Sequence, residues 1–334
     1  MLYVTTRDSQ DAFTANRALS EDRCPAGGFY VPMQLPRFDE GQIAALGENS
    51  FAQNTAMILN LLFGTKLDGW SVEFGIGRYP VKPVPLHGKI TVAESWHNPA
   101  YRFERLVSGI EKALRQSDQI SKTPSDWLRI ASRIAVLFGS YGLLRQNGTL
   151  ERGQLLDISL PASDGSALMA AWYASKMGLP VGTIICCCSE NSPLWNLFHK
   201  GELRHDCTNV PKDLERLIFG ALGRAETERF CRAMASGKNY QLDPEQLSRL
   251  REGIFVSVVS DRRIASTVPN LYKTTGFLAD PDTALSYSGL GDYRAAAGEN
   301  RQALIISEES PRFWISQIAE CMGISVAEVK EMLR

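Results

Sequence analysis

Residues able to act on a small molecule fall in a few short, separate stretches of the sequence. They include His97, Glu104 and the turn residues Ser163, Asp164, Gly165 and Ser166. An imidazole or a carboxylate can exchange protons with a substrate, and hydroxyl, amide and backbone N–H groups can hold its polar atoms. If Glu104 and Asp164 face one pocket, that pocket is acidic and would bind an amine or a metal cation rather than a phosphate.

Glu104 belongs to a segment with the periodicity of an amphipathic helix. The apolar stripe of this helix is Phe103, Leu106, Val107, Ile110 and Leu114. Asn98 suits the N-cap and Pro99 the first helical position, so the sequence predicts that the helix begins there. Glu104 lies one residue, or about 100°, from the edge of the stripe. Glu104 is either a solvated helix residue or a carboxylate that acts as an acid or base in a cleft. His97 has two similar interpretations: a structural histidine or a catalyst.

The pattern of apolar residues over 155–188 predicts a strand, a helix and a second strand. The apolar runs 155–160 and 181–188 flank a helical pattern at 166–177. Such a unit implies parallel strands joined by a right-handed crossover, with a ligand site beyond the first strand at the helix N-terminus. Asp164 stands at that point. As an N-cap it would cover the free amides with its own carboxylate and repel a phosphate.

The composition is that of an ordinary soluble globular protein. Of 334 residues, 44% are hydrophobic and 22% are charged, with a formal net charge of −1. Because the net charge is close to zero, we expect no nucleic acid partner. We also expect no membrane association, because the sequence shows neither an apolar run long enough to span a bilayer nor the pattern of a signal peptide. The seven cysteines include three adjoining ones, Cys186–Cys188, inside an apolar run. This pattern favours a buried strand in a reducing cytoplasm and, without Cys-x-x-Cys spacing, no metal site.

The segment His97–Arg105 resembles the stretch of threonine synthases that carries their cofactor lysine. In that family it reads His-Gly-Pro-Thr, two variable positions, then Phe-Lys-Asp, and the lysine holds pyridoxal phosphate (PLP) as a Schiff base. His97, Pro99 and Phe103 match, and Glu104 stands at the lysine position. A carboxylate has no amine to condense with an aldehyde, so covalent attachment at this position is excluded.

Other matches to threonine synthases follow in the family's order. Gly27–Pro32 resembles a turn of the amino-terminal domain, and Leu160–Ser166 stands at the phosphate-binding turn. Asn191 keeps one asparagine of the family's Asn-x-Asn-Asp turn, and Ser307 stands where the family places a hydroxyl against the pyridine nitrogen. A short connection near 116–124 stands where the family has a small subdomain with a Gly-Asp-Thr-Gly motif.

The resemblance implies an α/β fold related to the fold-type II PLP enzymes. We expect an amino-terminal α+β domain over 1–85. A reduced large domain over 86–334 should be built on a mostly parallel twisted sheet, with the small cofactor and substrate subdomain largely missing.

Loss of the lysine, the subdomain and the glycines of the phosphate turn predicts a threonine-synthase-like pseudoenzyme without PLP. It would bind a small molecule or a protein partner, and a full-length threonine synthase is a candidate partner. Two alternatives stay open: a lyase with PLP that converts O-phosphohomoserine into threonine and phosphate, or a remodelled enzyme in the old cleft. Catalytic candidates are Glu104 and His97. The candidate ligand-binding residues are Ser163, Asp164, Gly165, Ser166, Asn191 and Ser307.

Overall fold

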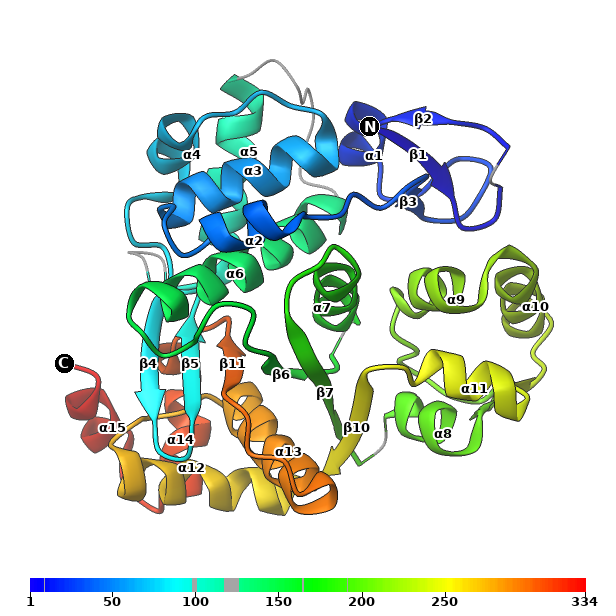
Figure 1. The fold of residues 1–334 in the computed structure, drawn as a ribbon. Helices are drawn as coiled ribbons and strands as arrows, with labels where there is room; N and C mark the ends of the chain where they lie inside the picture. Colours follow the sequence, from blue (N-terminus) through cyan, green and yellow to red (C-terminus); the bar gives the residue numbers. More distant parts are fainter. Residues whose placement is uncertain (9, 98–100, 117–125, 164, 191) are drawn as a thin grey trace.

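A six-stranded sheet lies at the centre of the computed structural model (Figure 1). Its spatial order is β10-β7-β6-β11-β5-β4, and neighbouring strands are parallel except for the antiparallel pair β4–β5. The strands are β4 (Lys82–Leu86), β5 (Ile90–Glu94), β6 (Leu156–Pro161), β7 (Val181–Ser189), β10 (Ile254–Val259) and β11 (Ala303–Ser307). The expected mostly parallel α/β sheet is confirmed. The residues described are 1–8, 10–97, 101–116, 126–163, 165–190 and 192–334.

Helices cover both faces of this sheet. On one face α7 (Ser166–Lys176) packs against β6 and β7, and α6 (Asp126–Gln146) packs against α7. On the other face α13 (Pro281–Ala297) crosses β6, β7, β10 and β11. Behind α13 lie α12 (Asp261–Thr275), α14 (Ile315–Met322) and α15 (Val326–Met332). Strands buried on both faces read as continuous apolar runs, as the central strands do here.

The three adjoining cysteines are buried in β7. Successive side chains of a strand point to opposite faces. Cys186 and Cys188 therefore join the core on the α7 side, whereas Cys187 joins the core on the α13 side. All seven cysteines are free thiols. The predicted burial of the triple cysteine is confirmed.

The amino-terminal region pairs a small sheet with helices. The sheet has the order β2-β1-β3, from Phe13–Thr14, Leu2–Thr5 and Tyr30–Pro32. The helices are α1 (Ala15–Ser20), α2 (Glu40–Ala45), α3 (Phe51–Phe63) and α4 (Gly69–Ile76). One hydrophobic core runs from this region into the α6–α7 side of the large sheet. The domain boundary expected at residue 85 falls within β4, which already pairs with β5.

A helical lobe lies beyond the β10 edge of the sheet (Figure 1). It contains α8 (Pro193–Lys200), α9 (Leu214–Leu222), α10 (Arg224–Ala235), α11 (Pro244–Leu250) and the short pair β8 (Glu202–Leu203) and β9 (Tyr240–Gln241). The segment from 224 to 250 forms two helices, α10 and α11, with β9 between them. Gly237 with a φ of 61° and Pro244 at the start of α11 divide them.

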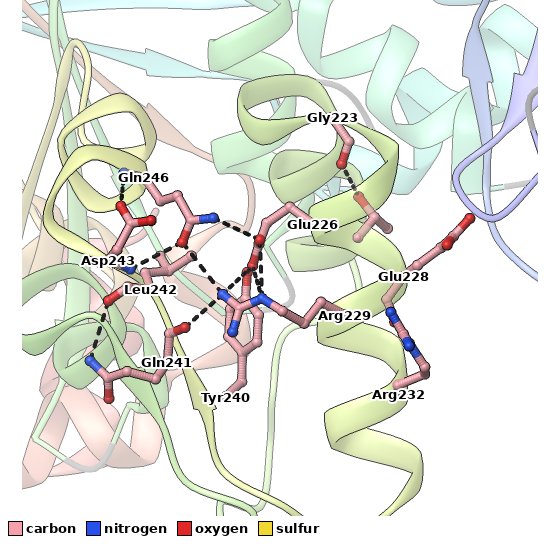
Figure 2. A network of polar contacts seen from close by, with 11 residues as sticks. Gly223, Glu226, Glu228, Arg229, Arg232, Tyr240, Gln241, Leu242, Asp243 and Gln246 are labelled. Atoms are coloured by element: carbon pink, nitrogen blue, oxygen red, sulfur yellow. Dashed lines mark hydrogen bonds and ion pairs between the residues drawn. The ribbon is translucent and has the colours of Figure 1, made fainter.

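A buried carboxylate ties this lobe together (Figure 2). Glu226 of α10 accepts hydrogen bonds from Tyr240 Oη at 2.5 Å, Arg229 Nη2 at 2.6 Å and Gln246 Nε2 at 2.8 Å. Arg229 also donates to the carbonyl of Gln241 at 2.6 Å. Charge-assisted hydrogen bonds of this kind are stronger than neutral ones, so Glu226 links α10, β9 and α11.

The helix that carries Glu104 begins later than predicted. α5 spans Phe103–Gln116, whereas the sequence predicts a start at Asn98 and Pro99, which lie outside the described residues. Tyr101 has a φ of 56°, and Arg102 bridges Glu309 in the segment after β11. This pairing holds the chain in a non-helical conformation up to Phe103. Among the described residues α5 therefore begins at Phe103, and the predicted cap at Asn98 and Pro99 stays a prediction.

The longest helix is α6, but neither it nor any other helix in the described ranges is both long and apolar enough to cross a membrane.

Candidate ligand-binding site

A cavity of about 880 Å³ opens at the carboxyl ends of β6 and β11. Parallel sheets usually bind ligands in this position. Its charged lining residues are Glu104, Arg133, Asp280, Asp282, Glu308 and Glu309. Its other walls come from Val136, Leu137, Leu160, Pro161, Ser163, Ala167, Ile306 and Trp314. Carboxylates therefore outnumber cations in this cavity.

A second cavity of about 1150 Å³ adjoins the first. Pro161, Ser163 and Asp282 line both, so the two cavities form adjacent compartments of one cleft. The second compartment is lined by neutral polar and apolar side chains together with Asp261 and Asp282. Its neutral polar side chains are Ser189, Ser192, Asn209 and Gln317, and its apolar ones include Ile264, Val268 and Leu285.

Arg133 is fully engaged inside the protein. Its Nε and Nη2 atoms bind the two carboxylate oxygens of Glu308 at 2.6 and 2.7 Å, and Nη1 donates to Ser166 Oγ at 2.8 Å. The guanidinium also lies over the ring of Phe103, 4.8 Å from its centroid. A bidentate pair of this kind uses the donor fork that would otherwise recognise an anion.

Glu104 matches the interpretation of a solvated helix residue, and it also lies beside the cleft. Its carboxylate accepts a hydrogen bond from Arg129 of α6 at 2.8 Å, and its side chain is 48% exposed. It also contributes to the wall of the first cavity. Glu104 is thus a solvated, paired residue at the mouth of the cleft.

Two aspartates at the start of α13 set the charge of the cleft. Asp280 is the buried N-cap and accepts from the backbone N–H groups of Asp282 and Thr283, both at 3.0 Å, and from the Thr283 hydroxyl. The Asp282 side chain is exposed and opens into the cleft, where it lines both compartments. Burial, followed by the charges of Asp280, Glu308 and Glu309, raises the pKa of Asp282 to about 7.

The Ser307 hydroxyl is already paired within the protein. It accepts a hydrogen bond from Trp96 Nε1 at 3.0 Å and donates to Asp280 Oδ2 at 3.1 Å. Ser307 itself is 2% exposed. His97 is exposed and lines neither cavity. Partial burial and the charge of Lys82 lower the pKa of His97.

The turn between β6 and α7 is only partly available to a ligand. Ser163 faces both compartments, whereas Ser166 is buried and bound to Arg133. The N-cap of α7 is Gly165, which has a φ of 82° and no side chain with which to cap. Asp164, predicted as that cap, and Asn191 lie outside the described residues.

Sequence reasoning missed the residues that give the cleft its charge. Arg133, Asp280, Asp282, Glu308 and Glu309 were not among the candidates, although the four carboxylates lie at or next to the ends of α13 and β11. The Asp-Pro-Asp-Thr run at 280–283 is a helix N-terminus signal, and Glu308 and Glu309 follow an apolar strand directly. Both patterns place carboxylates at the ligand edge of a parallel sheet.

The amino-terminal region is similar to a known family. Residues 2–71 match the family model described as threonine synthase N terminus. Human threonine synthase-like 1 is 23% identical over 177 residues, which is 48% of this chain and 24% of that protein. Threonine synthase from Pseudomonas aeruginosa is 28% identical over 173 residues, or 48% of this chain and 36% of that protein. These matches span about a quarter to a third of the relatives' length.

Solved structures extend the likeness to nearly the whole chain. The PLP-bound threonine synthase from Brucella melitensis has a TM-score of 0.84 at 16% identity, covering 97% of this chain and 92% of that one. The chain has the threonine synthase fold. The yeast threonine synthase gives a TM-score of 0.81 at 14% identity, covering 99% and 93%. The expected relation to fold-type II PLP enzymes is confirmed at the level of fold.

The cleft of this threonine-synthase-like chain does not fit PLP. Glu104 stands where the resemblance places the lysine, and no described lining residue of either cavity is a lysine. Arg133, the cation that faces the first cavity, is taken up by Glu308 and Ser166. Among the described lining residues, a phosphate dianion would meet more carboxylates than cations, and the guanidinium of Arg133 is already paired.

Proposed function

We propose that this threonine-synthase-like protein works without PLP and that its cleft binds a small molecule with a protonated amine. One observation carries the proposal: carboxylates surround Arg133, a guanidinium that is already paired. Excess negative charge in a concave site raises the local concentration of cations. The acidity expected from Glu104 and Asp164 is supplied mainly by residues after β11 and at the start of α13.

Asp282 and Glu309 are the acceptors best placed for an ammonium group. An ammonium has three N–H donors and needs oxygen acceptors. Within the described chain Asp282 makes no hydrogen bond or ion pair through its carboxylate, and Glu309 accepts one bond, from Trp314 Nε1 at 3.1 Å. A bound cation favours ionised Asp282, so affinity should rise as the pH increases through about 7, its pKa.

The cation should be organic rather than a metal ion. Among the residues described, no three His, Cys, Asp or Glu side chains come together in a way that could hold a metal. The second compartment adds hydroxyl and amide groups from Ser189, Ser192 and Gln317 beside apolar Ile264 and Leu285. Such a wall suits the neutral body of an organic amine, since its polar groups fix orientation and its apolar groups supply contact area.

Calorimetric titration tests the ligand class directly. 1,4-Diaminobutane serves as the amine probe and 1,4-butanediol as its neutral control, each at pH 6 and pH 8. We expect the diamine to bind about tenfold more tightly at pH 8, because a carboxyl with a pKa of about 7 changes from mostly protonated to mostly ionised. Asp282→Asn should remove this difference. The exposed Asp11→Asn is the matched control and should keep it. Equal binding of diol and diamine would contradict the proposal.

A PLP titration tests the other half of the proposal. After borohydride treatment, mass spectrometry should find no stoichiometrically modified lysine. A single modified lysine would overturn the proposal. Release of phosphate from O-phosphohomoserine would then identify a retained lyase activity.

A second function in the same cleft, acid–base catalysis on an amine substrate, is favoured by Asp282. A general acid or base works best with a pKa near the operating pH, and that of Asp282 is about 7. Proton NMR of bound amines would detect their conversion. Catalysis by this group requires that Asp282→Asn abolish turnover while Asp11→Asn leaves it intact.

A further inference from the structure

Large aromatic side chains stand exposed on and next to α4. Trp70 is 83% exposed and Phe74 is 67% exposed, and residues four apart share one face of a helix. Tyr79, three residues beyond the helix, is 68% exposed. In Figure 1 α4 lies at the outer edge of the molecule. We call Trp70, Phe74 and Tyr79 the α4 patch.

The opposite face of α4 is packed into the protein. Val72 and Ile76 are buried there, and α4 lies against α5 so closely that a Cβ on Gly75 would meet the Gly109 carbonyl oxygen at 2.2 Å. A surface helix normally turns polar side chains toward solvent, whereas α4 turns Trp70 and Phe74 outward. Its outward aromatic face therefore indicates a partner.

The charges around the patch have both signs. The ammonium of Lys112 lies 4.3 Å from the centroid of the Phe74 ring, and the guanidinium of Arg78 lies 5.3 Å from that of Tyr79. Glu73 lies between Trp70 and Phe74 on the same helix. Around a two-fold axis each residue of one copy meets a different residue of the other, so a self-complementary surface needs cations and anions together.

The area of the patch agrees with a dimer interface. A Phe, Tyr or Trp can bury roughly 150–250 Å², so three that are two-thirds or more exposed offer on the order of 400 Å². A standard interface buries about 800 Å² per partner, of which about 60% is apolar. Aromatic residues and arginine are also the residues that dominate binding energy at interfaces. We propose that a second copy of this chain docks on the α4 patch and forms a two-fold dimer.

Sedimentation velocity of the full chain from 1 to 100 µM tests the proposal. We expect the 37.0 kDa monomer to give way to a dimer as concentration rises. Replacing Trp70→Ser and Phe74→Ser together should weaken dimerisation at least tenfold. Met33→Ser, which removes an apolar side chain that is 60% exposed elsewhere, is the matched control and should leave it unchanged. Circular dichroism melts establish that each variant is folded.

Charge reversal then distinguishes a specific two-fold contact from non-specific hydrophobic association. Glu73→Lys and Lys112→Glu should each weaken the dimer, and the double variant should restore it because the opposite charges again meet across the axis. A chain that stays monomeric at 100 µM overturns the proposal. So does a dimer that survives loss of Trp70 and Phe74.

Discussion

Arg133 holds both carboxylate oxygens of Glu308, at 2.6 and 2.7 Å. The pair joins α6 to the segment after β11 across the floor of the cleft, and it neutralises one carboxylate there. Because the Arg133 guanidinium is already paired with Glu308, the carboxylates of Asp282 and Glu309 determine whether the cleft attracts a cationic or an anionic ligand. The proposed preference for an amine follows from this pairing.

The raised pKa of Asp282 predicts a pH-dependent stability. The folded pKa is about 7, and that of an unfolded aspartate is about 3.9. Between these values the folded state binds more protons, so the free energy of unfolding falls as the pH rises from about 4 to about 7. Asp282→Asn removes this loss and should stabilise the protein at pH 8 by on the order of 1 kcal/mol, after solvent screening is allowed for.

Urea denaturation of both proteins at pH 5 and pH 8 measures the effect of Asp282. The advantage of the variant should be larger at pH 8. An equal difference at both pH values would mean that Asp282 titrates as an ordinary surface carboxylate.

Restoring a lysine should not restore cofactor binding. Glu104→Lys supplies an amine at the position of the family lysine, but it leaves Asp280, Asp282 and Glu309 in the cleft that the dianionic cofactor would have to enter. We expect no stoichiometric aldimine absorbance at micromolar PLP, because like charges disfavour binding of the dianion. A one-to-one aldimine in this variant would mean that Glu104 alone excludes the cofactor.

The Glu226 network should contribute strongly to stability. Glu226→Gln weakens the charge-assisted bonds to Tyr240 and Arg229 and presents an N–H₂ group to donors (Figure 2). A loss of about 1–3 kcal/mol is expected, because buried partners are left unsatisfied. Glu228→Gln, which removes only an exposed pair with Arg224, is the control and should change stability by less than about 0.5 kcal/mol. Urea denaturation separates the two, and similar effects would contradict the assigned role.

The α4–α5 crossing depends on two glycines. Gly75→Ala would place a methyl group 2.2 Å from the Gly109 carbonyl oxygen, so we expect at least about 2 kcal/mol of destabilisation. Gly291 lies in α13, where a methyl group meets nothing nearer than 3.9 Å. Gly291→Ala should therefore be neutral or stabilise by up to about 1 kcal/mol. Thermal melts that rank the two variants in the opposite order would refute this packing.

The sequence alone determined the elements that depend on local signals. The length and flanks of the apolar runs predict β6, α7 and β7 within one or two residues, and the ordered matches predict the threonine synthase fold. These predictions succeed because apolar periodicity records which side of an element is buried. Glu104 and Ser163, two of the candidate site residues, do line the cleft.

Only the tertiary structure decided the start of α5 and the charge of the cleft. Arg102 pairs with Glu309 and Tyr101 has a positive φ, so among the described residues the helix begins at Phe103. Asp282 and Glu309 come from separate elements and meet because β11 places its carboxyl end beside the N-terminus of α13. Such convergence depends on strand order in the sheet. Local sequence patterns do not contain that order, so the acidic cleft emerges only once the chain is folded.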